Sequence, residues 1–197
     1  MDGDVLRFGL IGAGLWGRNY IGTIASLDGV ELAWIVDPDS GVKAKIASRC
    51  PFFDNLQTAL QSGSVDGVII ASPPPCHDRD IRAAVTEGLP VLVEKPLVLS
   101  AQAARDLLAF VEERGGYVLV DHIHLFHPGY RKLKEMASPL GSVTAVKSVG
   151  GNWGPFRPET SVLWDWGPHD VALCLDLMGK SPMAVNARYQ EKEETPE

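Results

Sequence analysis

The amino-acid sequence predicts an α/β protein with a doubly wound parallel sheet, followed by a smaller, truncated α+β region. Short apolar runs rich in valine and isoleucine alternate with amphipathic stretches, as in parallel sheets that helices cover on both faces. This alternation changes after about residue 122. We therefore expect one domain over residues 1–122, a partial α+β domain over 123–190, and a disordered, charged tail over 191–197.

The first region contains the strands and helices of one complete sheet. Strands are expected at residues 7–11, 31–36, 67–71, 90–94 and 117–120, with a weaker one near 51–53. The intervening helices are expected at residues 16–27, 41–49, 56–62, 78–87 and 101–114. The last helix has the clearest signals, because Ser100 can cap its start and Gly115 and Gly116 can end it.

The second region has a different pattern. Residues 127–137 and 167–178 are expected to be helices. Residues 142–154 show the period-two alternation of a strand, and residues 183–190 are expected to form another strand. Two short strands cannot bury their faces alone, so a partner chain is one way to complete this sheet. The sequence thus predicts a homo-oligomer that forms through the partial C-terminal sheet.

Composition excludes several classes of protein. The 197 residues are 45% hydrophobic and 22% charged, as in ordinary globular proteins, and the net charge of −7 argues against binding to nucleic acid or to an anionic membrane surface. The N-terminus shows no export signal, and no apolar run is long enough to span a bilayer. The three cysteines form no CxxC pair. We expect a cytoplasmic protein without a cysteine metal site.

A glycine-rich loop follows the first predicted strand. Gly12, Gly14 and Gly17 form G-x-G-x-x-G with Leu15 and Trp16 between the last two glycines, and Asp37 stands at the end of the second strand. In this context the glycines permit a tight turn, close approach of a pyrophosphate and close packing of the helix. A carboxylate at the second strand end binds ribose hydroxyls and repels a 2′-phosphate. The loop predicts a Rossmann site for NAD(H) rather than NADP(H).

The chain also contains Glu94-Lys95-Pro96 at the end of the fifth predicted strand. Together with "GLIGAGLWG", "IVDPD", "ASPPPCH", "GLPVLVEKPL", "HPGYRKLKE" and "WDWGPHD", this motif resembles the Gfo/Idh/MocA family of NAD(P)-dependent oxidoreductases, which includes glucose–fructose oxidoreductase and inositol dehydrogenase. The resemblance implies that Lys95 lies beside the nicotinamide ribose and the substrate, and that Asp165 and His169 match the family's catalytic D-x-x-x-H pair. It also implies that further residues line the cofactor: Leu15, Trp16, Ser72, Pro73, His77 and Glu94.

The chemistry of these residue types suits hydride transfer to or from a carbinol carbon. An imidazole near its unperturbed pKa, here His169, can move the proton of the oxygen. Asp165 can orient that ring, and Lys95 can polarise the oxygen or act as the base itself. The alternative is structural: Lys95 as an exposed strand-end residue, and Asp165 and His169 as residues at a helix start.

Other histidines and tryptophans give weaker signals. His122, His124 and His127 alternate along the chain, but no carboxylate or cysteine completes a metal set at a familiar spacing, so we predict no metal site. The tryptophans at 153, 164 and 166 can stack on a sugar ring or simply pack against a helix.

Two functional hypotheses follow from this sequence. One is an NAD-dependent dehydrogenase that acts on a sugar, a cyclitol or a nucleotide-linked sugar. The other is a catalytically incomplete dinucleotide-binding module that serves as a sensor or partner subunit, because members of the family are usually much longer than this chain. The motif residues favour the first hypothesis.

Overall fold

The sheet of the protein has the predicted doubly wound order. The structure, a computed structural model, describes residues 5–46, 50–151 and 160–188. Within them, six parallel strands form one sheet in the order β3-β2-β1-β4-β5-β6. The strands are β1 (Leu6–Ile11), β2 (Val30–Val36), β3 (Phe52–Phe53), β4 (Gly67–Ile70), β5 (Val91–Glu94) and β6 (Val118–Asp121).

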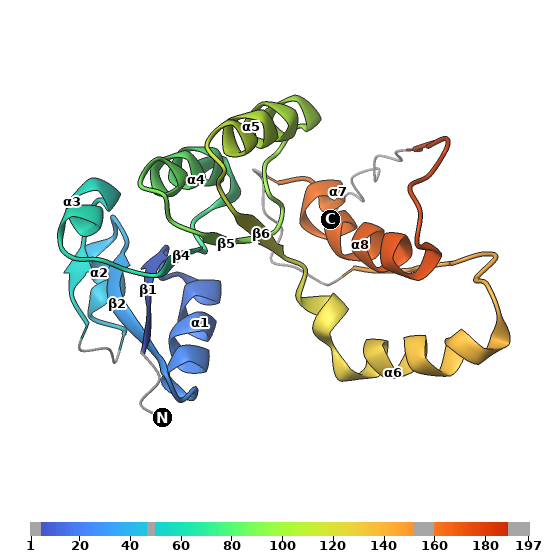
Figure 1. Cartoon of the computed structure of the whole chain (residues 1–197), viewed down its shortest axis with the longest axis horizontal. Coiled ribbons are helices and arrows are strands. Elements are labelled where there is room, and N and C mark those ends of the chain that lie inside the picture. Colours follow the sequence, from blue (N-terminus) through green and yellow to red (C-terminus); the bar gives the residue numbers. More distant parts are fainter. Residues whose placement is uncertain (1–4, 47–49, 152–159, 189–197) are drawn as a thin grey trace, which may run out of the picture.

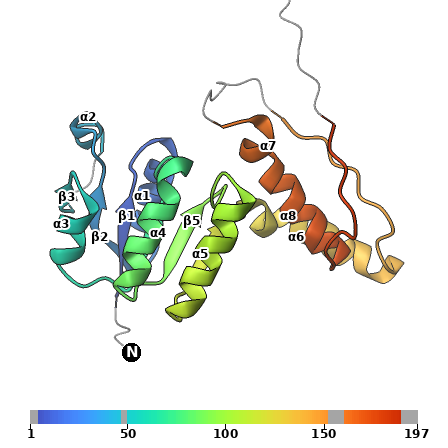
Figure 2. The same cartoon turned by 90° about the horizontal axis from the view of Figure 1, so that it is seen from above.

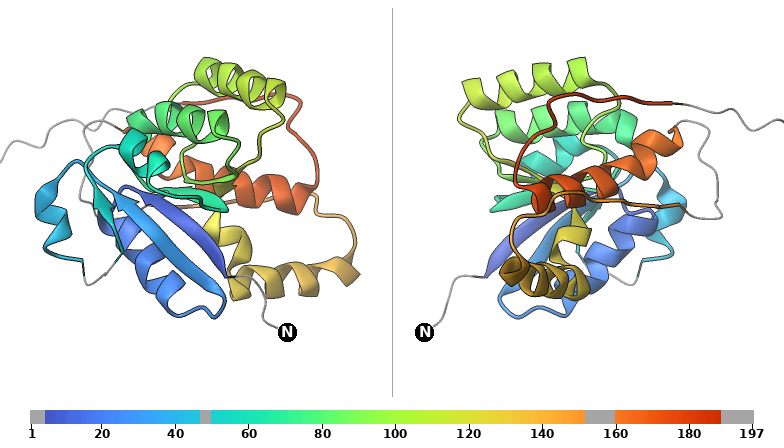
Figure 3. Two further views of the ribbon diagram at one scale, coloured as in Figure 1. Left: turned by 60° about the vertical axis from the view of Figure 1, so that its left-hand side comes forward. Right: turned by 90° about the vertical axis from the view of Figure 1, so that its right-hand side faces the viewer.

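Helices cover both faces of this sheet. They are α1 (Leu15–Ala25), α2 (Ser40–Lys43), α3 (Leu56–Gln61), α4 (His77–Thr86) and α5 (Ala101–Glu113). Figure 3 shows α4 and α5 on one face of the sheet and α1 on the other. The predicted helix at 41–49 is only one turn long in the structure, and residues 47–49 lie outside the described residues.

The strand pattern explains why both faces need cover. Leu10, Ile35 and Ile69 point to the α1 face and pack with Ile24, whereas their neighbours Ile11, Val36 and Ile70 point to the opposite face. On that face they pack against residues of α4 and α5 that include Ile81, Ala84 and Leu107. Burying each large aliphatic side chain contributes about 1.5–3 kcal/mol, so neither face tolerates exposure. The continuous apolar strands therefore require a sheet between two helical layers.

Local signals place the helix ends. The Ser100 hydroxyl accepts a hydrogen bond from the backbone N–H of Ala103 at 3.0 Å, which confirms the predicted cap of α5. Asn55 caps α3 in the same way through the N–H of Thr58 at 2.9 Å. Each cap satisfies a donor that the first turn of the helix leaves free.

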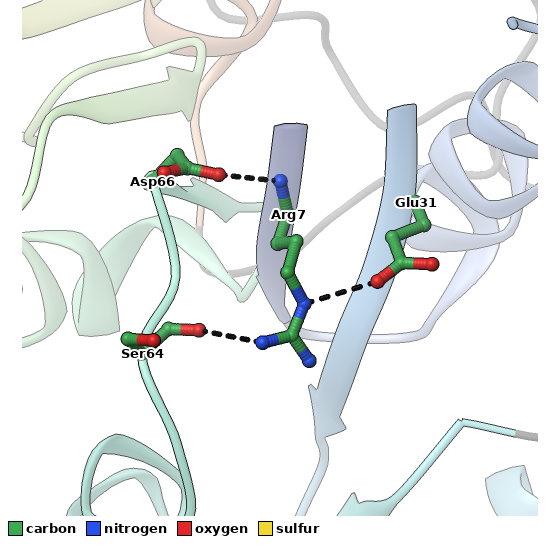
Figure 4. Close-up of polar contacts among 4 residues, drawn as sticks. All are labelled: Arg7, Glu31, Ser64 and Asp66. Atoms are coloured by element: carbon green, nitrogen blue, oxygen red, sulfur yellow. Dashed lines mark hydrogen bonds and ion pairs between the residues drawn. The ribbon is translucent and has the colours of Figure 1, made fainter. Parts of the chain in front are cut away.

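Polar contacts hold the edge of the sheet at which the strands begin. Arg7 on β1 donates to the Glu31 carboxylate on β2 at 3.0 Å and to the Ser64 carbonyl at 3.2 Å (Figure 4). Its backbone N–H donates to the Asp66 carboxylate at 2.7 Å. Exposed contacts of this kind contribute little energy each. They join β1 to β2 and to the segment before β4, at the edge away from the glycine loop.

Among the described residues after β6, three α-helices form: α6 (Pro128–Ala137), α7 (Val162–Asp165) and α8 (Gly167–Met178). They lie on the β6 side of the sheet, away from β3 (Figures 1 and 2). Asp176 on α8 accepts hydrogen bonds from Tyr130 and Lys134 on α6, at 2.5 and 2.8 Å. Lys134 and Tyr130 lower the pKa of the Asp176 carboxyl. These contacts join the two helices that the sequence predicts.

The two strands predicted after residue 122 are wrong over the described residues. Residues 142–151 and 183–188 run without regular structure, and residues 152–154 and 189–190 of the same predictions lie outside the described part. Val149 and Met183 are almost fully exposed, at 90% and 104%. Alternation shows that a segment can present two faces, but a strand also needs a neighbour that accepts its hydrogen bonds. The described residues supply no such neighbour here. The tail at 191–197 is likewise not described.

The strand order fixes where a ligand can bind. The chain runs from β1 toward β2 and β3 on one side and crosses over to β4, β5 and β6 on the other. The loops after β1 and β4 therefore diverge at the carboxyl edge of the sheet. Crevices at such a switch point are the usual ligand sites of open α/β sheets.

Candidate active site

The glycine loop is packed too tightly for side chains at two of its three glycines. Gly12 has a φ of +87°, and a Cβ there would lie 2.4 Å from the backbone nitrogen of Ser72. A Cβ at Gly17 would lie 2.1 Å from the carbonyl oxygen of Gly12. Gly12 thus allows β1 and β4 to end side by side, and Gly17 allows α1 to sit against the turn.

Gly14 is different because no protein atom occupies the space beside it. A Cβ at Gly14 would meet nothing within 4 Å, and Leu15 next to it is 72% exposed. Gly14 is the N-cap residue of α1 and supplies no side-chain cap, so the first N–H groups of this eleven-residue helix face outward. Free N–H groups at a helix N-terminus attract phosphate. The cradle therefore fits the pyrophosphate of a dinucleotide.

Asp37 ties the end of β2 to this loop. Its carboxylate accepts hydrogen bonds from the backbone N–H of Ala13 at 2.8 Å and from that of Asp39 at 2.9 Å. Each oxygen is thereby held in place and keeps a further lone pair. A fixed carboxylate beside the loop can accept from ribose hydroxyl groups, as the sequence predicts.

His77 has a structural role in the site, because its ring is not accessible to a ligand. Its side chain is fully buried. One ring nitrogen lies 2.9 Å from the carbonyl oxygen of Pro96, and the other lies 2.8 Å from that of Ser72. The ring thus links the loop after β4 to the turn after β5. The expected role of His77 in lining the cofactor is corrected to positioning, while Ser72 and the exposed Pro73 form the loop above it.

Lys95 lies at the end of β5 and forms an ion pair with Asp165 at the end of α7. Its Nζ lies 3.0 Å from the Asp165 carboxylate and 2.7 Å from the Asp165 carbonyl oxygen. The Lys95 side chain is only 9% exposed and that of Asp165 is 27% exposed. Lys95 is therefore not an exposed strand-end residue. Breaking a pair that is this buried is costly, because one charge is left without a partner.

His169 lies in the first turn of α8, where its surroundings disfavour the imidazolium form. It is 8% exposed, and its Nδ1 is buried with no hydrogen-bond partner among the described residues. Burial, with the nearby Lys95 ammonium and His124, lowers the pKa of His169 to about 4. The expectation of an unperturbed imidazole was wrong, because the sequence alone does not show which groups surround the ring. At neutral pH this ring can accept a proton.

A pocket brings these side chains together. Its volume is about 550 Å³. Trp16 of α1 lines it with Lys95, Asp165 and His169. The predicted catalytic residues thus meet here with two of the residues predicted to bind the cofactor, Trp16 and Lys95. The remaining lining residues are Ile123, His124, Phe126, His127, Pro128 and Trp166.

Two aromatic rings beside His169 were not predicted as catalytic or cofactor residues. The His124 ring centroid lies 4.3 Å from that of His169, and the Trp166 centroid lies 5.7 Å away, both in edge arrangements. The sequence left sugar stacking and packing open for Trp166. In the structure its ring packs on His169 and lines the pocket, and sugar stacking stays a prediction. The sequence offered His124 only as one of three alternating histidines considered for a metal site, because its place beside His169 depends on a short turn after β6.

Glu94 does not point into this pocket. It is 8% exposed, and its Oε1 lies 3.1 Å from the Tyr20 hydroxyl oxygen. The same hydroxyl lies 2.5 Å from Asp121. Through its hydrogen bond with Tyr20, Glu94 therefore joins helix α1 to strand β5, which Lys95 follows directly.

The described part of the chain has no candidate metal site and no candidate membrane span. In that part of the chain no group of three or more His, Cys, Asp or Glu side chains is arranged to hold a metal ion. None of the described helices has both the length and the apolar character to cross a membrane.

The fold and these residues agree with a sequence comparison against protein families. Residues 6–122 match the oxidoreductase family with the NAD-binding Rossmann fold, the Gfo/Idh/MocA family. The chain belongs to this family. The match spans the whole sheet, from β1 to β6, and includes the glycine loop, Asp37 and Lys95.

Several curated relatives of this chain are named dehydrogenases. The chain is 29% identical over 192 residues to inositol 2-dehydrogenase 2 of Saccharopolyspora erythraea, covering 92% of this chain and 56% of that protein. It is 28% identical over 187 residues to UDP-N-acetylglucosamine 3-dehydrogenase of Acidithiobacillus ferrooxidans, covering 92% and 57%. The chain thus spans little more than half the length of these relatives.

Solved structures extend the match to the helices after β6. A protein of Magnetospirillum magnetotacticum MS-1 is 40% identical, with a TM-score of 0.83 over 95% of this chain and 62% of that one. GenD2 from gentamicin A biosynthesis, solved in complex with NAD, is 29% identical, with a TM-score of 0.78 over 91% and 55%.

Proposed function

We propose that this chain carries the cofactor site and the proton-transfer residues of an NAD(H)-dependent oxidoreductase. Its reaction would move a hydride between nicotinamide and a carbinol or keto carbon of a sugar, a cyclitol or a nucleotide-linked sugar. The observation that carries this proposal is the meeting of Trp16, Lys95, Asp165 and His169 around one pocket at the carboxyl edge of the sheet.

The cofactor part of the proposal rests on the glycine loop and Asp37. The open space at Gly14 and the uncapped start of α1 suit a pyrophosphate. The negative charge of Asp37, fixed by two backbone N–H groups, favours ribose hydroxyls and disfavours a 2′-phosphate. NAD(H) is therefore preferred over NADP(H) in this proposal.

The proposed proton transfer follows from the lowered pKa of His169. When bound, NAD⁺ would accept the hydride at C4 of its nicotinamide ring. His169, neutral at pH 7, would take the proton of the substrate hydroxyl, which leaves an imidazolium beside Asp165. Lys95, held by Asp165, would donate a hydrogen bond to the oxygen as negative charge grows on it. In this proposal His169, rather than Lys95, is the base.

The substrate class is proposed from relatives and from the pocket walls. The relatives named above act on inositol and on a UDP-linked sugar. In this chain, Trp166 and Phe126 offer aromatic faces to a sugar ring, and His124, His127 and Lys95 offer polar groups to its hydroxyls.

The test measures turnover and cofactor binding separately. The chain and its His169→Ala variant are assayed for NADH formation with a panel of cyclitols, free sugars and UDP-sugars, and NADH binding is followed by fluorescence. We expect turnover with one class and a loss of about 10²-fold or more in the variant, since a positioned base contributes that much. NADH binding should survive the substitution, because His169 is outside the glycine loop.

A matched control is His127→Ala, which removes a pocket imidazole that caps α6. We expect it to lower turnover far less than His169→Ala does. NADH binding without turnover on any substrate would reject the enzyme and support the alternative, a dinucleotide-binding module. Equal losses in both variants would reject His169 as the base.

A further inference from the structure

Three acidic groups from three elements meet behind Lys95. The Tyr20 hydroxyl comes from α1, Glu94 from the end of β5 and Asp121 from the end of β6. The Tyr20 oxygen lies 3.1 Å from Glu94 Oε1 and 2.5 Å from Asp121 Oδ2. We call these residues the acid triad. They are not needed for the proton transfer described above.

If both carboxyl groups of the acid triad are ionised, only one proton is available for its two hydrogen bonds. The tyrosine hydroxyl has one proton and can direct it fully at only one acceptor. If it donates to Asp121, its oxygen lone pairs face an ionised Glu94, which repels them. One further proton, placed on Glu94, turns this repulsion into a second hydrogen bond.

The surroundings of Glu94 favour that proton. Glu94 is 8% exposed, so its charged form loses most of its hydration. Burial, followed by the negative charge of Asp121, raises the pKa of the Glu94 carboxyl. The groups that oppose this rise are the Tyr20 hydroxyl and the backbone N–H and ammonium of Lys95. Burial and the Asp121 hydrogen bond also raise the pKa of Tyr20.

We propose that Glu94 is protonated at neutral pH and donates to the Tyr20 hydroxyl oxygen, which donates in turn to Asp121. The acid triad then carries one negative charge instead of two. His122, which follows Asp121, adds no positive charge there, because burial lowers its pKa. The proton on Glu94 thus sets the net charge of the acid triad, next to Lys95.

This charge matters for the direction in which Lys95 points. An ionised Glu94 would compete with Asp165 for the Lys95 ammonium, since both carboxylates lie near it. A neutral Glu94 leaves Asp165 as the charged partner and so holds the ammonium toward the pocket. Glu94 and Tyr20 are therefore positioning residues for Lys95. The proposal stands independently of the reaction, because its tests need no turnover and no cofactor.

The direct test is a pH titration of the unliganded chain by carbon-13 NMR. Side-chain carboxyl signals are assigned through bonds, with the exposed Glu87 as an internal reference. We expect the Glu94 signal to keep its protonated position at pH 7, above the ordinary carboxyl pKa of 4.5. A Glu94 signal that has already reached its ionised position at pH 7 would overturn the proposal.

A second test uses protein stability and the Glu94→Gln variant, whose amide N–H replaces the donor. A raised pKa means that folded Glu94 keeps a proton that the unfolded chain loses above the ordinary value of 4.5. From pH 5 to pH 7 the unfolding equilibrium constant of the wild type, divided by that of Glu94→Gln, should therefore rise by up to about tenfold per pH unit. The Glu87→Gln control should show no such shift. A constant difference between wild type and Glu94→Gln would contradict the proton on Glu94.

Discussion

At the scale of single residues, the site depends on empty space as much as on side chains. Gly14 is the clearest example, because it is open on the side where a Cβ would project. Gly22, farther along the same helix, is equally open, but it lies two turns away from the N-terminus of α1. The two glycines thus have similarly open surroundings and differ in their position along α1.

We predict that Gly14→Val abolishes NADH binding and leaves the fold intact. A Cβ at this position meets no protein atom within 4 Å, but the valine side chain fills the path of a pyrophosphate to the free N–H groups. Gly22→Ala should bind NADH normally and be more stable by up to about 1 kcal/mol, as alanine favours a helix. Fluorescence titration and thermal unfolding of both variants make the comparison. Normal NADH binding by Gly14→Val would remove the cradle from the proposed function.

Asp37 allows a second prediction at this scale. The Asp37→Asn substitution removes the charge that would repel a 2′-phosphate, and like charges in contact cost several kcal/mol. We expect the ratio of NADPH to NADH dissociation constants to fall by about tenfold or more. Asp39→Asn, which alters the neighbouring capping carboxylate, should leave this ratio unchanged. If both variants behave alike, Asp37 does not select the cofactor.

Much of the site could be predicted from residue types, but its electrostatics could not. Gly12, Gly17 and Lys95 lie within short motifs whose local context is visible in the sequence. The pKa of His169 depends on burial and on Lys95 and His124, which are distant in sequence and meet the ring only in the fold. The ion pair of Asp165 with Lys95 spans 70 residues and is equally invisible before folding.

At the scale of elements, helix α1 does more than present its N-terminus. Tyr20, one turn after the glycine loop, fastens α1 to the ends of β5 and β6 through Glu94 and Asp121. A helix that binds the cofactor is thereby tied to the strands that carry Lys95 and lead to His124. Sequence reasoning assigns Tyr20 only to a helix, because its partners are 74 and 101 residues away.

We predict that Tyr20→Phe destabilises the protein by about 1–3 kcal/mol, the cost of leaving a buried polar group without its partner. Tyr117→Phe is the matched control, because Tyr117 is 64% exposed and should cost little. Urea unfolding at pH 7 measures both variants. Equal stability of the two variants would show that the acid triad contributes nothing to the fold.

The elements also show where pattern alone fails. The helices over 127–137 and 167–178 were predicted and form as α6 and α8, because a helix satisfies its own backbone hydrogen bonds. The strands over 142–154 and 183–190 do not form in their described parts, because strand hydrogen bonds need a second segment. The α6 and α8 helices are instead joined by Tyr130, Lys134 and Asp176.

At the scale of the whole molecule, the site places a cost on folding at acid pH. His169 must enter the folded state neutral, with a pKa of about 4 instead of 6.5. Between these two values the unfolded chain binds a proton that the folded chain does not. The free energy of unfolding therefore falls as the pH is lowered from 6.5 to 4.

We predict that His169 alone accounts for a loss on the order of 3 kcal/mol across this range, given the shift of its pKa from 6.5 to about 4. The His169→Gln variant cannot take up the proton, so its stability should fall less steeply as the pH is lowered.

His122, whose pKa is also lowered by burial, keeps part of the slope in both proteins. The exposed His127 provides the control: His127→Gln should change the slope less than His169→Gln does, even if the lost α6 cap lowers its stability at every pH. Unfolding by urea at half-unit pH steps from 4 to 7 gives the slopes. The same slope in His169→Gln and in the wild type would mean that the ring is not held neutral, and the assignment of His169 as the base would lose its electrostatic ground.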